Sequence, residues 1–149
     1  EMGMSSFGEI SLLTNIAKPT TAVITIIGSS HIGELGSREN ILKAKLEILD
    51  GLDKNGSLII NNDNDLLNIW NKENQDKHKH ITYGIEEKSI LKAKNIKIRE
   101  DGSSFEIEID DNTYNIEVPV SGKHFIYNSL AAIAVGLENN IEIDKKIIA

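Results

Sequence analysis

The sequence contains no cysteine. This excludes disulfides, thiolate metal sites and cysteine nucleophiles, so a metal ion would have to bind through histidine, aspartate, glutamate or a modified lysine. The lack of cysteine fits a reducing compartment, and we expect a cytoplasmic protein. No apolar run approaches the roughly 18 residues of a membrane span, and no signal-peptide pattern opens the sequence. We therefore expect no membrane insertion.

Basic stretches are lacking as well. The chain has 16 Lys and Arg against 23 Asp and Glu, a net charge of −7, and the two signs are interspersed. Nothing resembles a basic stripe that follows phosphates, so nucleic acid is not an expected partner. The sequence also has no G-x-x-x-x-G-K-[ST] phosphate loop, so this chain does not hold a nucleoside triphosphate by that device.

What is present is enough for a globular domain. The 149 residues are 40% apolar, which suits one domain with a real core, and we expect a single domain over residues 1–149. The sequence begins at Glu1 without methionine, directly on an apolar motif. We expect it to be a piece of a longer protein.

Two hydrophobic periods predict an α/β fold. Short β-branched runs at 21–27, 57–60 and 80–84 alternate with helical patterns through Ile16, at 38–49 and from Leu66 onward, which indicates a mostly parallel sheet flanked by helices. From Leu91 the period becomes two, and this predicts an antiparallel meander near residues 91–118 at the edge of that sheet. A deeply packed helix at 124–138 and a short helix at 144–149 complete the prediction.

Lys45 is the residue that fits its helix least well. At 100° per residue it falls in the middle of the apolar face formed by residues 38–49, while Lys43 and Glu47 point the other way. An unpaired buried ammonium costs several kcal/mol and tends to lose its proton. The pattern leaves two interpretations open, a lysine that extends along the apolar face to water and a lysine with a chemical task.

Polar residues follow several predicted strands, where open α/β sheets place their ligands. Glu1 and His31 both lie at strand ends and could share a divalent cation such as Mg²⁺, although a lone loop histidine is more often a surface residue. His78 and His80 lie in a charged stretch and are predicted to be solvated. The polar run at 61–65 suits either a ligand or a solvated turn, with Asp63 or Asn64 capping the next helix.

Asn128 lies on the last long helix among apolar residues on every face. Its amide therefore needs a partner, which either a backbone group or a ligand supplies.

Several segments together resemble one family, the ATP-dependent Mur ligases of peptidoglycan synthesis. The resemblance covers most of the chain in the right order, is weakest from 69 to 118, and is more specific than any single motif. The matching segments are residues 1–4, 7–10, 16–19, 22–25, 30–32, 35–41 and 43–48, then Asn61, Asp63, Pro119, Gly122 and His124, and finally residues 128–134.

The resemblance implies a truncated central ATP-binding domain that lacks the part with the phosphate loop. In the parent enzyme, ATP would phosphorylate the carboxylate of a UDP-N-acetylmuramoyl-tripeptide, and the amine of D-alanyl-D-alanine would attack the acyl phosphate. ATP and Mg²⁺ are the implied cofactors, and both peptides are the implied partners. We expect the isolated chain to be inactive.

Carried over position by position, the resemblance assigns roles to seven residues. Glu1 and His31 match Mg²⁺ ligands, and Lys45 matches a lysine that CO₂ carbamylates. Asn128 matches an asparagine that contacts adenine, and His124 begins the same motif. The other two, Asn61 and Asp63, match positions near the nucleotide.

This chain departs from the family at two positions. The family usually has His-Asn where His124 and Phe125 stand, and commonly has asparagine in place of Ile26. Two alternatives remain: a related amide ligase acting on another amino acid or on folate, and a non-catalytic binding domain that keeps the fold.

Overall fold

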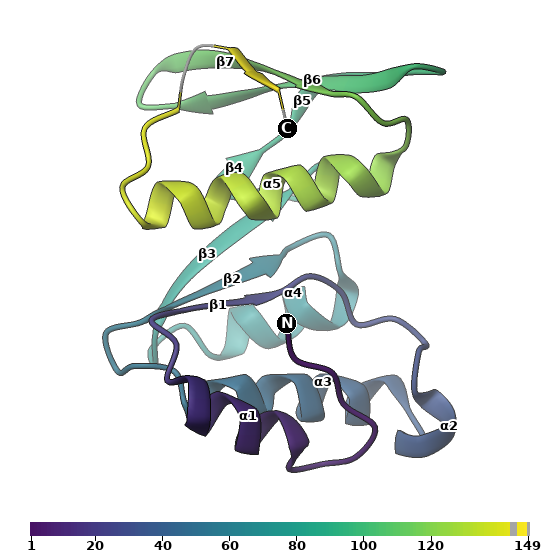
Figure 1. Ribbon diagram of the computed structural model, residues 1–149, viewed down its shortest axis with the longest axis vertical. Helices are drawn as coiled ribbons and strands as arrows, with labels where there is room; N and C mark the ends of the chain where they lie inside the picture. The colour runs from purple at the N-terminus through teal and green to yellow at the C-terminus, as the bar shows by residue number, and fades with distance from the viewer. Residues whose placement is uncertain (144–145, 149) are drawn as a thin grey trace.

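The computed structural model describes residues 1–143 and 146–148. Figure 1 shows these residues arranged in layers. Helices α1 (Glu9–Ala17), α3 (Arg38–Leu46) and α4 (Asp65–Glu73) cover one face of a first sheet, and α5 (Lys123–Glu138) lies between that sheet and a second one. A short α2 (Ile32–Leu35) precedes α3. No helix in the described part of the chain is long and apolar enough to cross a membrane.

The first sheet is entirely parallel. Its order is β1 (Thr21–Ile24), β2 (Ser57–Asn61), β3 (Lys79–Gly84) and β4 (Leu91–Lys92). Every residue of β2 is buried, as expected for a strand covered by helices on both faces. The predicted α/β alternation is confirmed, although the first strand ends at Ile24 rather than at residue 27.

The second sheet contains the predicted meander. Strands β5 (Lys94–Arg99), β6 (Gly102–Ile109) and β7 (Asn112–Val118) are antiparallel, and β8 (Lys146–Ile148) pairs parallel with β7. The prediction that the meander forms the edge of the first sheet is wrong, because its apolar face packs against α5 as a separate sheet. The helix predicted at 144–149 is wrong over β8, and the rest of that range lies outside the described residues.

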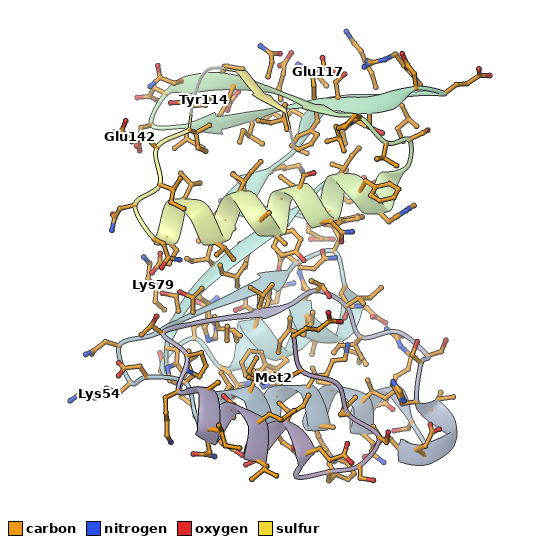
Figure 2. The ribbon with its side chains drawn as sticks, in the orientation of Figure 1. Met2, Lys54, Lys79, Tyr114, Glu117 and Glu142 are labelled. Atoms are coloured by element: carbon orange, nitrogen blue, oxygen red, sulfur yellow. The ribbon has the colours of Figure 1, made fainter. Side chains whose placement is uncertain are left out.

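Two hydrophobic clusters hold the layers together. One lies between the first sheet and helices α1, α3 and α4, and Met2 packs against it (Figure 2). The other surrounds α5, which is apolar nearly all round because it contacts both sheets. Tyr114 packs against this second cluster, whereas Glu117, on the opposite face of β7, points away from it (Figure 2).

Helix ends agree with local sequence signals. The side chain of Ser37 caps α3, and the side chain of Asn64 caps α4 by accepting from the Leu67 N–H. The helix predicted over 38–49 is divided, because α3 ends at Leu46 and a 3₁₀ turn, η1 (Glu47–Asp50), follows. Gly51 then lies so close to α1 that a Cβ atom would be 2.2 Å from the Thr14 carbonyl oxygen.

Candidate functional site

A cavity of about 330 Å³ lies where β1, β2 and β3 end, the edge at which parallel sheets bind ligands. It gathers the four residues predicted near a nucleotide, Asn61, Asp63, His124 and Asn128, from segments far apart in the sequence. Its complete lining is Thr25, Ile26, Asn61, Asp63, Asn64, Tyr83, His124, Tyr127 and Asn128. We call it the strand-end cavity.

Asp63 is the most extensively bonded side chain of this cavity. Its carboxylate accepts backbone N–H groups from Ile85 at 2.6 Å, Glu87 at 2.7 Å and Glu86 at 3.0 Å. The hydroxyl of Tyr127 donates a fourth bond of 2.8 Å. Partial burial raises the pKa of Asp63, but these hydrogen bonds outweigh it and hold the pKa below its usual value. The carboxylate is therefore ionised and well satisfied.

The two asparagines and His124 differ from Asp63 and from one another in their exposure and hydrogen bonding. Asn61 is buried, and its Oδ1 accepts the backbone N–H of Asp63 at 3.0 Å. Asn128 is exposed at the cavity, so its amide faces solvent rather than the apolar surroundings that the helical pattern predicts. His124 is exposed too, and its ring lies close to Gly122, where a Cβ atom would be 2.9 Å from His Cε1.

Sequence reasoning missed two tyrosines in this cavity. Tyr83 is fully buried, its hydroxyl has no hydrogen-bond partner among the described residues, and burial raises its pKa. Burial and the bond to Asp63 raise the pKa of Tyr127 as well. The positions of both tyrosines in the sequence could have indicated the cavity. Tyr83 lies near the carboxyl end of a predicted strand, and Tyr127 lies one turn after His124 on the same helix face.

A second cavity, of about 460 Å³, runs along β1 and brings Glu1 and Lys45 together. Met2, Ile10, Pro19, residues 21–25 and Ile48 complete its lining. Glu1 itself is exposed. Two of the three residues predicted at a metal or carbamate site thus share one cavity.

Lys45 is half-buried in this cavity. Its Nζ donates a 2.9 Å hydrogen bond to the carbonyl oxygen of Ile26, just beyond β1. Burial lowers the pKa of Lys45, which enlarges the fraction of neutral amine. The side chain is thus held by the backbone of Ile26.

His31 lies outside both cavities. It occupies the N-terminal cap position of α2 with φ of 65°, and it is exposed on the loop after β1. Within residues 1–143 and 146–148, no group of three or more His, Asp and Glu side chains is arranged to hold a metal ion. Mg²⁺ in proteins commonly takes one or two side-chain ligands and completes its shell with water and phosphate oxygens.

The prediction that His80 is solvated is wrong. Its Nδ1 lies 2.7 Å from Asn71 Oδ1, its ring stacks on Trp70 with 5.4 Å between centroids, and its Nε2 is buried. Burial, and then the charge of His78, lower its pKa. These contacts make His80 part of the packing between α4 and β3.

Comparison with known proteins adds the family. Residues 1–136 match the Mur ligase middle domain. The UDP-N-acetylmuramoyl-tripeptide–D-alanyl-D-alanine ligase of Bacillus subtilis is 44% identical over 136 residues, which are 91% of this chain. MurF from Acinetobacter baumannii superposes with a TM-score of 0.86 at 26% identity over 96% of the chain. MurF from Thermotoga maritima in complex with ADP gives 0.84 at 26% identity over 97%.

The chain spans 28% of the B. subtilis relative, 31% of the A. baumannii protein and 33% of the T. maritima protein. The family match, in contrast, covers residues 1–136 of the 149. The chain therefore belongs to the Mur ligase middle-domain family.

Proposed function

We propose that this chain carries part of the nucleotide and metal site of an ATP-dependent ligase that joins D-alanyl-D-alanine to a UDP-N-acetylmuramoyl-tripeptide. One observation carries the proposal: the strand-end cavity gathers Asn61, Asp63, His124 and Asn128 from separate segments. The reaction comes from relatives such as the B. subtilis ligase. Both peptide substrates belong to the whole enzyme, of which this chain would be the central domain.

The strand-end cavity suits the base of ATP. An exposed amide at Asn128 can both donate to and accept from adenine, and aromatic side chains offer apolar contact area. The related MurF from T. maritima was solved with ADP, which fits this assignment. Asn128 is the residue that we expect to recognise the base.

Glu1, His31 and a carbamylated Lys45 are the residues that would hold Mg²⁺ in the whole enzyme. Glu1 offers a carboxylate and His31 an imidazole, and Lys45 shares the cavity of Glu1 with a pKa lowered by burial. A neutral Lys45 amine can attack CO₂: Nζ forms a bond to carbon, the electron pair of one C=O π bond moves to oxygen, a proton passes from the nitrogen to water, and the product is a carbamate anion. Bound Mg²⁺ would neutralise phosphate charge during transfer.

The reaction then has two steps. The tripeptide carboxylate attacks the γ-phosphate of ATP and releases ADP, and the D-alanyl-D-alanine amine displaces phosphate from the acyl phosphate to form the amide. The isolated 149-residue chain, which lacks the phosphate loop, should show no turnover.

Replacing Asn128 tests the assignment. In the full-length enzyme, Asn128→Ala should raise KM for ATP at least tenfold, because a base-selecting hydrogen bond is lost. Asn115→Ala is the matched control, since Asn115 is exposed on β7 in the second sheet. An unchanged KM for ATP in Asn128→Ala would place the base elsewhere.

Two other outcomes would support the alternative functions. Acceptance of another amino acid in place of D-alanyl-D-alanine would support a related amide ligase, and nucleotide binding without turnover would support a binding domain.

A further inference from the structure

We propose that Asp63 is a positioning residue whose carboxylate joins the walls of the strand-end cavity, rather than a group that touches the nucleotide. The inference rests on the proposed nucleotide function, and it changes the role that the family resemblance implies for Asp63.

The carboxylate has no capacity left for a ligand. Its Oδ1 accepts from the backbone N–H of Glu87 at 2.7 Å and of Glu86 at 3.2 Å. Its Oδ2 accepts from Ile85 at 2.6 Å, from Glu86 at 3.0 Å and from the Tyr127 hydroxyl at 2.8 Å. An ionised carboxylate offers about four lone-pair positions, so these donors occupy them. A nucleotide would have to displace one of them.

The three backbone donors are consecutive and converge on one anion. Successive N–H groups in a turn form a concavity that binds anions, and here the anion is a side chain of the same protein. Gly84 permits this arrangement, because a Cβ atom at that position would lie 2.8 Å from Asp63 Oδ1. The turn after β3 is therefore shaped around Asp63.

The fourth donor, the Tyr127 hydroxyl, links the Asp63 carboxylate to the residues that we expect to bind the base. Tyr127 immediately precedes Asn128 and follows His124 by one turn of α5. Asn61 joins the same network, because its Oδ1 accepts the N–H of Asp63. The carboxylate thus connects the end of β2 and the start of α5, which both contribute to the cavity lining, with the turn after β3.

The test uses the full-length enzyme with ADP as the probe, at a temperature well below unfolding. Asp63→Asn and Tyr127→Phe should each weaken ADP binding, by at least tenfold and threefold respectively, while circular dichroism stays unchanged. Asp65→Asn is the matched control, because Asp65 is exposed and pairs with Arg38. It should bind ADP within twofold of the wild type.

Tyr127→Phe separates positioning from direct contact. It releases a lone pair of Asp63 Oδ2, so a direct contact between Asp63 and the nucleotide would be kept or strengthened. Unchanged or tighter ADP binding in Tyr127→Phe overturns the proposal, as does wild-type affinity in Asp63→Asn.

Hydrogen exchange gives a readout that does not depend on the nucleotide. The backbone amides of Glu86 and Glu87 should exchange at least tenfold faster in Asp63→Asn than in the wild type, because the amide side chain cannot accept all the donors. Unchanged exchange overturns the proposal. Failure of the wild-type enzyme to bind ADP contradicts the proposed function instead, and the exchange measurement still decides the role of Asp63.

Discussion

The ammonium of Lys45 and the carbonyl oxygen of Ile26 are joined by a 2.9 Å hydrogen bond that ties α3 to the chain just beyond β1. The bond uses the backbone of Ile26, so it does not depend on which side chain stands there. Replacing Ile26 by another residue should therefore leave the position of Lys45 intact.

Removing the Lys45 amine tests its proposed carbamylation. In the full-length enzyme, Lys45→Ala should lower kcat at least a hundredfold, and a small carboxylate such as formate should restore part of the rate. Lys43→Ala is the matched control, because Lys43 is exposed on the same helix. Full activity of Lys45→Ala would remove this residue from the mechanism.

Glu47 should stabilise the fold by capping a helix from a distance. Its carboxylate accepts N–H groups from Gly8 at 2.8 and 2.9 Å and from Ser11 at 3.2 Å, at the start of α1. Glu47→Ala should lower the free energy of unfolding by about 1 kcal/mol, the usual cost of a lost cap. Denaturant unfolding measures this, with exposed Glu73→Ala as control. Equal losses in both variants would contradict it.

The two cavity tyrosines should respond oppositely to loss of the hydroxyl. Tyr127→Phe removes a bond to an ionised carboxylate and should cost about 1–2 kcal/mol of unfolding free energy. Tyr83→Phe removes a buried hydroxyl that has no partner among the described residues, so stability should stay equal or rise. Thermal unfolding of the two variants measures this difference. A larger loss of stability in Tyr83→Phe than in Tyr127→Phe would show that the Tyr83 hydroxyl has a partner.

His80 should make the fold less stable in mild acid. Burial lowers its pKa in the folded state, so the unfolded chain takes up a proton first as pH falls below about 6.5. The contribution of neutral His80 is complete above that pH and is lost as pH falls towards the folded pKa. Chemical unfolding should show that the free energy of unfolding declines between pH 7.5 and 5, and that this decline is smaller in His80→Gln than in the wild type. An equal decline in that variant would assign it to other groups.

Local pattern was enough to predict most elements of the first sheet. The buried run that became β2 and the apolar α5 need no knowledge of their partners. The position of the meander cannot be predicted without knowing what it packs against. Alternation shows that a strand has an apolar face, but it does not show which surface that face covers. The same limit explains His80, whose burial depends on Trp70, in a different element.

In the candidate site, too, some features could be predicted from the sequence and others required the folded structure. Periodicity singled out Lys45 because a cation on an apolar face is costly. In the structure Lys45 is half-buried on α3, and its Nζ is bonded to the chain just beyond β1. Chemistry pointed to Asn128 and to the polar run at 61–65, and the family resemblance added His124 and the expected role at a nucleotide. Folding was needed to bring these residues into one cavity. Which of them have free hydrogen-bonding groups depends on side-chain geometry that no sequence pattern contains.

The most direct test of the proposed function is ADP release by the full-length enzyme with ATP, Mg²⁺ and UDP-N-acetylmuramoyl-tripeptide. We predict sustained release that requires D-alanyl-D-alanine, with one ADP formed for each amide bond. ADP release that is independent of D-alanyl-D-alanine, or its complete absence in an enzyme that still binds ADP, would contradict the assignment.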